Sequence, residues 1–246
     1  MTTPEFTVAV LLYGDHPDLA ERCLGPLWPL QRSGLIDLRI GMNECSFATA
    51  AYVDRNRAAA NVVREIENIH KYPMMRKLRD AAPLKSFWMW FDDDSYISHP
   101  NPVEWLAGIK RRLQGADVVG QLWKMALSGN QHEWIRRRDW YVGKEVRARQ
   151  TISFPQGGWW ATASANLLNN DWPDPDIERK GGDVMFGEMC RQQGLRISDV
   201  GMKYEDVRIN ADKEGRHSRS KTRGPMPLPK PVGYDYQPPN LSAPRT

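Results

Sequence analysis

Three consecutive carboxylates, Asp92, Asp93 and Asp94, follow directly on the apolar and aromatic residues 87–91. A buried strand of that composition would deliver them to the carboxyl edge of a parallel sheet, where open α/β sheets bind ligands. Burying unpaired carboxylates there is costly. Mg²⁺ or Mn²⁺ would remove that cost, because these ions prefer oxygen ligands and can bridge carboxylates to a diphosphate. The triplet alone is compatible with a metal site or a solvated acidic face, and its place after a strand favours the metal site.

The surrounding segments predict the scaffold. Apolar runs of strand length alternate with segments of helical period, which indicates a single α/β domain with a mostly parallel central sheet and flanking helices. Strands are expected at 6–12, 35–42, 62–63, 86–91 and 116–121, with a strand or turn at 152–160. Helices are expected after residue 15, where Leu19, Cys23 and Leu27 share a helical spacing, and at 48–60, 74–82, 103–113, 163–169 and 182–193. Gly194 would end the last helix.

Two segments depart from this alternation. Residues 122–150 are rich in Trp and Arg and have no clean period, so we interpret them as an insertion. Residues 225–246 hold seven of the 18 prolines, which indicates an extended tail. We therefore expect one folded domain over residues 1–224 and a Pro-rich C-terminal tail over 225–246.

Composition also bounds the location. The longest apolar runs are far shorter than the roughly 20 residues that cross a bilayer, so no membrane span is expected. Residues 1–5 do not have the pattern of a secretory leader. Cys23, Cys45 and Cys190 are odd in number and far apart, which is typical of reduced thiols. A cytoplasmic location is therefore predicted, the host cytoplasm if the protein is viral.

Four segments occur in an order that resembles GT-A-fold glycosyltransferases with a DxD motif, most closely the fringe and core-1 β1,3-galactosyltransferase type. They are Phe87-Trp88-Met89-Trp90-Phe91-Asp92-Asp93-Asp94-Ser95-Tyr96-Ile97, Gln156-Gly157-Gly158-Trp159-Trp160-Ala161, Gly181-Gly182-Asp183-Val184-Met185-Phe186-Gly187-Glu188, and the stretch from Arg208 to His217. Together they span most of residues 6–223. The resemblance implies a GT-A, Rossmann-like fold and an enzyme, a hexosyltransferase. Such an enzyme moves a sugar from a nucleotide-diphosphate donor, here expected to be UDP-linked, to an acceptor hydroxyl.

The resemblance also implies a metal site for Mn²⁺ or Mg²⁺. The last aspartate of the motif, Asp94, would contact the ion directly. Asp92 and Asp93 would orient ribose or sugar hydroxyls, and both would be able to bind the ion through water, with Asp92 as the second candidate metal ligand. His217 would complete the site as a neutral imidazole. The alternatives are a strand-end turn for Asp92 and a surface position for His217.

In the same pattern Asp183 is the catalytic base. A carboxylate within hydrogen-bond reach of the acceptor hydroxyl, opposite the leaving diphosphate, can take its proton, and this geometry inverts the anomeric carbon. A second acidic residue commonly precedes the base in this group, whereas Gly182 stands there in this chain. The alternative is that Asp183 caps the following helix. Glu188, on a different helical face, is a weaker substitute.

Donor contacts are expected at two places. Gly157 and Gly158 would let the backbone approach the sugar, or would form a plain turn. Trp159 could stack on a sugar or base, but it and Trp160 would point to opposite faces of a strand, so at most one should enter the site. The resemblance places Tyr13, Asp15 and Glu44 where GT-A enzymes hold the nucleotide base. Tyr13 would stack on uracil, and Asp15 or Glu44 would accept a hydrogen bond from N3 of uracil. The alternative for Asp15 is that it caps a helix.

Residues 122–150 would form an acceptor-side insertion. Basic residues there interleave with Trp123, Trp134, Trp140 and Tyr141, which combines phosphate attraction with stacking surfaces. The basic residues are Arg136, Arg137, Arg138, Lys144, Arg147 and Arg149, and a second cluster comprises Lys213, Arg216, Arg219, Lys221 and Arg223. A hydroxymethylated pyrimidine in DNA, flipped from the stack, is the best prediction for the acceptor, as for some bacteriophage enzymes. A surface glycan or protein acceptor, and basic faces that are merely solvated, are the alternatives.

Two other function classes explain less of the sequence. A phosphotransferase of the haloacid dehalogenase type needs Thr or Val at the fifth position of its Asp loop, and Tyr96 stands there instead. A non-catalytic nucleic-acid-binding module would explain the basic residues but would leave the triplet Asp92 to Asp94 and Asp183 without a role.

Overall fold

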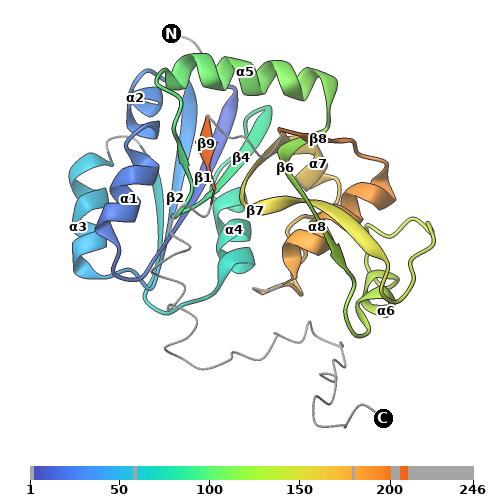
Figure 1. Ribbon diagram of the computed structural model, residues 1–246. Helices are drawn as coiled ribbons and strands as arrows, with labels where there is room; N and C mark the ends of the chain where they lie inside the picture. The colour runs from blue at the N-terminus through green and yellow to red at the C-terminus, as the bar shows by residue number, and fades with distance from the viewer. Residues whose placement is uncertain (1–2, 58–59, 179–180, 201–205, 210–246) are drawn as a thin grey trace, which may run out of the picture.

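A seven-stranded sheet forms the centre of the molecule (Figure 1). The structure is a computed structural model and describes residues 3–57, 60–178, 181–200 and 206–209. In spatial order the strands are β3 (Asn61–Glu65), β2 (Ile36–Asn43), β1 (Phe6–Tyr13), β4 (Phe87–Asp92), β7 (Thr151–Ala163), β6 (Val118–Ala126) and β8 (Ile197–Asp199). A small second sheet pairs β5 (Tyr96–Ile97) with β9 (Val207–Arg208).

Four of the six neighbouring strand pairs in the large sheet are parallel. The parallel pairs are β3–β2, β2–β1, β1–β4 and β6–β8, whereas β7 runs antiparallel to both β4 and β6. β1 and β4 are apolar and almost wholly buried, as strands covered on both faces must be. The expected α/β fold with a mostly parallel sheet is confirmed.

Eight helices of the described chain flank the sheet. They are α1 (Pro17–Leu24), α2 (Leu27–Arg32), α3 (Phe47–Asn56), α4 (Lys71–Asp80), α5 (Pro102–Gly115), α6 (Gln131–Ile135), α7 (Ser164–Leu168) and α8 (Gly182–Gln193). Figure 1 shows α5 across one end of the sheet and α6 beside the far end of β6 and β7. None of the described helices is long and apolar enough to cross a membrane.

Several element boundaries differ from those expected. The helix predicted through Leu27 divides into α1 and α2 at Pro26, which has no N–H to continue the ladder. α3 ends at Asn56 instead of residue 60. α4 begins at Lys71, before Pro73, because a proline in the first turn removes an N–H that has no helical partner anyway.

The region interpreted as an insertion is folded into the domain. β6 continues to Ala126, beyond the expected end at residue 121, because its second half pairs with residues 151–155 of β7. Beyond it, Trp134 and Trp140 are each 3% exposed and belong to the apolar cluster on one face of the sheet, together with Trp160 and Phe186. A second apolar cluster, including Phe91 and Trp159, covers the other face. The Pro-rich tail predicted for 225–246 lies outside the described residues.

Candidate functional site

The ends of β1, β2 and β4 meet at one edge of the sheet. The parallel register pairs Leu11 with Asp92 and Tyr13 with Asn43, so Tyr13, Glu44 and the aspartate triplet lie at this edge as predicted. Asp15 does not cap α1, whose N-terminus has no side-chain capping bond; it accepts a hydrogen bond from Ser46 instead. Glu44 has a positive φ of 54° and donates its backbone N–H to the Glu65 carbonyl oxygen.

Asp92 is held from two sides. The indole Nε1 of Trp90 donates to Oδ1 at 2.9 Å, and the Nζ of Lys71 donates to Oδ2 at 3.0 Å. Burial raises the pKa of Asp92 to about 6, against the opposing effect of Lys71. Desolvation lowers the pKa of Lys71, but Asp183 and Asp92 outweigh it and raise the pKa above the ordinary lysine value. Because each oxygen of Asp92 already accepts a hydrogen bond, Asp92 is better placed to support a ligand than to hold a metal ion directly.

Asp93 and Asp94 form the turn after β4, in which the Ser95 N–H donates to the Asp92 carbonyl oxygen at 3.0 Å. Asp93 is buried and Asp94 is half-buried. In the described part of the chain no three His, Cys, Asp or Glu side chains form a group able to hold a metal ion by themselves. Asp94 and Asp92 nevertheless provide the oxygen donors that Mg²⁺ and Mn²⁺ prefer, and a diphosphate would supply further oxygens. His217, the third predicted ligand, lies outside the described residues.

A bulge in β7 brings the predicted glycine segment to these carboxylates. β6 advances two residues from Gly120 to Leu122 while β7 passes from Trp160 to Pro155, so residues 156–159 are not paired with β6. Bulges of this kind occur beside active sites, where they redirect backbone groups. Here the carbonyl oxygen of Gly157 accepts a hydrogen bond from Lys71 Nζ at 2.7 Å.

Asp183 lies against the same bulge. A Cβ added to Gly157 would come within 2.2 Å of Asp183 Oδ2, so only glycine leaves room for this carboxylate. Asp183 stands in the first turn of α8, whose N-cap residue is Gly181. Its Oδ1 accepts a hydrogen bond from the Tyr72 hydroxyl at 2.5 Å and lies 3.8 Å from Lys71 Nζ. Asp183 is therefore not the N-cap residue of α8, and its carboxylate contacts Tyr72 and Lys71.

Lys71 thus bridges the two candidate carboxylates. Its ammonium group contacts Asp92, the Gly157 carbonyl and Asp183, and its side chain is 16% exposed. Sequence reasoning missed both Lys71 and Tyr72, because the helix was expected to begin after Pro73. The one signal available was electrostatic: three adjacent aspartates at a buried strand end need a cation nearby.

Two other candidates have structural roles. Glu188 is fully buried and accepts hydrogen bonds from Arg191 and Gln192, so it does not substitute for Asp183. The predicted donor contact Trp159 is 1% exposed and packs on Phe91 and Trp105. Trp160 points to the other face, as expected, but is equally buried. Both rings lie in the core because β7 is an interior strand covered on both faces.

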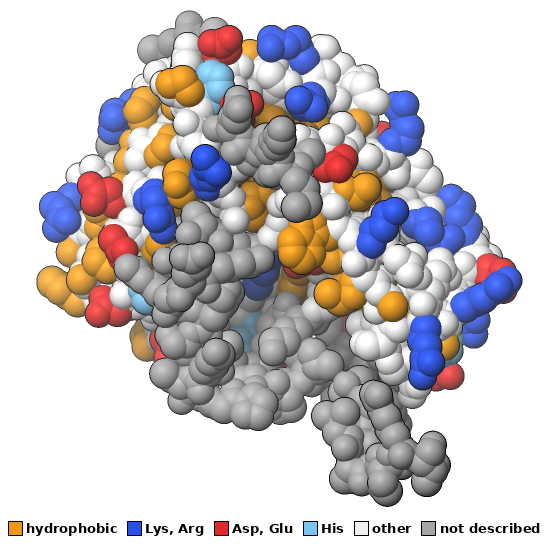
Figure 2. Space-filling model, in the orientation of Figure 1, with side chains coloured by type: hydrophobic (Ala, Val, Ile, Leu, Met, Phe, Trp, Pro, Cys, Tyr) orange, Lys and Arg blue, Asp and Glu red, His pale blue; other side chains and the backbone are white. Residues whose placement is uncertain are grey.

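The basic segment is partly neutralised by its own chain. Arg138 stacks on Trp134 and pairs with Asp174 and Asp176, and Arg147 pairs with Glu145. A larger set remains exposed: Arg136, Arg137, Lys144, Arg147 and Arg149. Figure 2 shows Lys and Arg side chains gathered along the margin on the side of β6 and α6. The prediction that Trp134 and Trp140 provide stacking surfaces is wrong, because both rings are buried.

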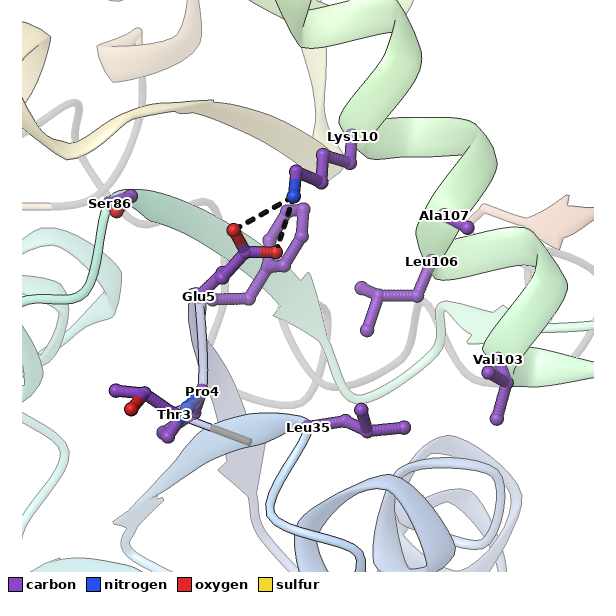
Figure 3. A pocket seen from close by; sticks show the side chains of 10 residues that line it. Thr3, Pro4, Glu5, Leu35, Ser86, Val103, Leu106, Ala107 and Lys110 are labelled. Atoms are coloured by element: carbon purple, nitrogen blue, oxygen red, sulfur yellow. Dashed lines mark hydrogen bonds and ion pairs between the residues drawn. The ribbon is translucent and has the colours of Figure 1, made fainter. Parts of the chain in front are cut away.

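A separate pocket of about 550 Å³ lies at the opposite end of the sheet (Figure 3). Residues preceding β1, β2 and β4 line one side of it, and α5 lines the other. Lys110 of α5 forms an ion pair with Glu5 at its wall. This pocket is formed at the amino ends of the strands and does not include the aspartate triplet.

The fold is shared with sugar-transferring enzymes of low sequence identity. No family model and no curated protein matches the sequence. The mannosyltransferase PcManGT from Pyrobaculum calidifontis, solved with GDP-Man and Mn²⁺, has a TM-score of 0.60 at 16% identity over 91% of this chain and 61% of its own. Residues 1–349 of S. aureus TarS have a TM-score of 0.53 at 17% identity over 82% of this chain and 59% of their own. The same TarS fragment has been solved with UDP-GlcNAc and with UDP.

This chain therefore spans about three fifths of these structures. At such identities the likeness establishes the fold, and the expected GT-A type is confirmed by it.

Proposed function

We propose that this protein is a metal-dependent, inverting glycosyltransferase that moves a sugar from a UDP-linked donor to an acceptor hydroxyl. The observation that carries the proposal is the position of Lys71, whose ammonium joins Asp92 of β4 to Asp183 of α8 at the carboxyl edge. Two carboxylates from different elements at one ligand-binding edge suit donor binding and proton transfer within one site. The described neighbours that share this fold were solved with nucleotide sugars.

The donor would lie along the ends of β1, β2 and β4. Tyr13 would stack on uracil, and Asp15 or Glu44 would accept from its N3. Asp92 and Asp93 would orient ribose and sugar hydroxyls. The backbone of the bulge at Gly157 and Gly158 would line the sugar. Trp159 is not part of this proposal, because its ring is in the core.

Asp94, supported by Asp92 and completed by His217, would hold Mn²⁺ or Mg²⁺. When bound, the ion would supply positive charge that stabilises the leaving diphosphate. The chain's own contribution is to orient the carboxylates, since Lys71 and Trp90 fix both oxygens of Asp92.

Asp183 would act as the general base. Its carboxylate takes the proton of the acceptor hydroxyl as that oxygen forms a bond to the anomeric carbon. The bond from the anomeric carbon to the diphosphate oxygen breaks, and its electron pair leaves with UDP. Attack opposite the leaving group inverts the anomeric configuration. A positioned base of this kind contributes about 10²–10⁴-fold to the rate.

For the acceptor we propose a hydroxymethylated pyrimidine in DNA. The exposed basic residues of the 136–149 segment support a polyanion. The helix α6, which precedes these basic residues, approaches the site: the side chain of Gln131 lies 3.3 Å from the position of a Cβ at Gly181, two residues before Asp183. The test is the mass of a hydroxymethylated oligonucleotide after incubation with UDP-glucose, UDP-GlcNAc or GDP-mannose and Mn²⁺. A hexose-sized gain is expected, and no gain with any donor would exclude DNA.

A surface glycan or protein is the second candidate acceptor. It is favoured by the burial of Trp134 and Trp140, which removes two of the surfaces on which nucleic-acid bases could stack. A sugar transferred to an oligosaccharide or peptide hydroxyl, with none transferred to DNA, would establish this alternative.

Donor binding itself is tested by calorimetric titration of UDP and UDP-glucose with and without Mn²⁺. Wild type should bind in the presence of Mn²⁺, and Asp94→Ala should lose that binding. Asp54→Ala, which removes a carboxylate from exposed ion pairs on α3, is the matched control and should bind like wild type. Failure of wild type to bind any nucleoside diphosphate would contradict the proposal and favour a non-catalytic nucleic-acid-binding module.

A further inference from the structure

Tyr72 is a buried tyrosine whose hydroxyl group points at the proposed base. It is 2% exposed, and its hydroxyl donates to Oδ1 of Asp183 at 2.5 Å. Burial and the nearby Asp183 raise the pKa of Tyr72 well above its ordinary value, so the phenol keeps its proton and remains a donor. The bond is charge-assisted, which makes it stronger than a bond between neutral groups.

The backbone around Tyr72 is fixed by contacts that lie away from the carboxylates. The buried side chain of Asn43 donates to Asn68 and accepts from the Ile69 N–H, which pins the loop before α4. The Tyr72 N–H donates to the Glu178 carbonyl oxygen at 3.1 Å. The Tyr72 ring packs edge-on against Trp172, with 6.4 Å between ring centroids. The hydroxyl therefore has a fixed position.

Two glycines make room for this contact. A Cβ at Gly182 would lie 2.1 Å from Cζ of Tyr72, so any side chain at position 182 would displace the ring. A Cβ at Gly157 would collide with Asp183 itself. The absence of an acidic side chain at position 182 thus has a steric reason: the space beside Asp183 is filled by Tyr72.

The hydrogen bond also gives the two carboxylate oxygens of Asp183 different surroundings. Tyr72 and Lys71 both approach Oδ1, at 2.5 and 3.8 Å. Among the described residues, neither of these groups bonds to Oδ2, which lies over the bulge at Gly157. Oδ2 is therefore the oxygen placed to accept a proton from a bound hydroxyl.

We propose that Tyr72 is a positioning residue for the general base, holding Asp183 through Oδ1 so that Oδ2 faces the acceptor. The inference rests on the proposed function, because it assigns a partner to the proposed base. Without the phenol, the carboxylate can rotate onto the Lys71 ammonium, which lies within ion-pair distance and would weaken it as a proton acceptor. Tyr72 touches no reacting atom in this account.

The test is a double-mutant cycle with Tyr72→Phe and Asp183→Asn. Turnover is measured as UDP released from UDP-glucose or UDP-GlcNAc with Mn²⁺, using water and hydroxymethylated DNA as acceptors. Tyr72→Phe keeps the ring and removes only the hydroxyl. We expect it to lower kcat about tenfold, the effect of one charge-assisted hydrogen bond, with the KM for the donor unchanged. In the Asp183→Asn background the same change should have less than a twofold effect, since there is no base left to position.

Tyr52→Phe is the matched control. The Tyr52 hydroxyl accepts a hydrogen bond from Trp28 of α2 at 3.3 Å and does not bond to Asp183, so its loss should leave kcat unchanged. Equal factors for Tyr72→Phe in both backgrounds, or an unchanged kcat in the single variant, would overturn the inference while leaving Asp183 as the base. A fully active Asp183→Asn variant, or a wild type that releases UDP from neither donor, would instead overturn the proposed function and this inference with it.

Discussion

The two halves of the sheet supply different parts of the candidate site. The parallel half, β3-β2-β1-β4, contributes Asp92 and the strand ends proposed to bind the nucleotide. The other half, β7-β6-β8, is called the antiparallel half because β7 runs antiparallel to both of its neighbours. It contributes the bulge of β7 and the helix α8, which packs on β7 and carries Asp183. Lys71 and Tyr72 of α4 reach across from the first half to Gly157 and Asp183 in the second. Under the proposed function, the first half binds the nucleotide and the metal ion, whereas the second half lines the donor sugar and supplies the base.

The largest effect is expected for Asp183→Asn, which tests whether the second half supplies the base. The variant keeps the shape of the side chain and removes its capacity as a base. We expect kcat to fall by about 10²–10⁴-fold, the usual contribution of a general base. UDP release under saturating donor measures it, with Asp54→Asn as the control that should remain active. Retention of full activity would show that the second half does not carry the base.

Arg39→Met should damage the first half instead. Arg39 is fully buried and donates to Asp37 and to the carbonyl oxygens of Leu78, Arg79 and Pro83, so it closes the end of α4 against β2. Breaking a buried network of this kind costs about 3–5 kcal/mol, and the free energy of unfolding should fall accordingly. Urea denaturation measures the loss. Arg147→Met, at an exposed ion pair, should leave the midpoint unchanged; equal effects in both variants would contradict this account of Arg39.

Gly157→Ala should act at the junction of the halves. The new Cβ would overlap the Asp183 carboxylate and push it from its position. Misplacement of a catalytic group by about 1 Å can cost about 10²-fold, and we expect a kcat loss of that order with little change in UDP affinity. Gly115→Ala, at the end of α5, has no neighbouring atom within 4 Å and should behave like wild type. A Gly157→Ala variant with normal turnover would show that the close approach of Asp183 is dispensable.

The smallest predicted effect is a pH dependence of stability in the metal-free protein. Burial raises the folded-state pKa of Asp92 from 3.8 to about 6. Between these values the folded state binds more protons at Asp92 than the unfolded state does, so this group's contribution to stability falls as pH rises through the folded-state pKa and levels off above it. The stability of Asp92→Asn relative to wild type should therefore increase from pH 4 to 6, as measured by urea denaturation. A relative stability that decreases over this range would contradict the burial of Asp92.

The two halves also differed in how far sequence predicted them. The parallel half was predicted well, because β1, β2 and β4 are apolar runs and the aspartate triplet follows one of them. The carboxylates at its edge could be predicted from that pattern alone. The resemblance to a known family identifies Asp183. The residue type of Gly194 predicts that α8 ends there, and Gly194 does adopt the left-handed conformation at that end.

The antiparallel half was predicted poorly for physical reasons. The second half of β6 exposes Trp123 and Met125 and so lacks the buried pattern of a strand. The arginines beside Trp134 and Trp140 suggest surface positions for both rings, yet Arg138 covers Trp134 and the rings lie in the core.

Lys71 and Tyr72 could not be predicted from local sequence either. Their contacts with Gly157 and Asp183 span sequence separations of 86 and 111 residues, which no local pattern encodes.

We propose that one half of the molecule binds the nucleotide and the metal ion and that the other half supplies the base. It is tested most directly by measuring UDP-glucose binding by calorimetry and UDP release on the same preparations of Asp94→Ala and Asp183→Asn, each with Mn²⁺. The account predicts that Asp94→Ala loses binding and turnover together, whereas Asp183→Asn binds like wild type and loses turnover alone. Loss of binding in both variants, or full turnover in Asp183→Asn, would contradict it.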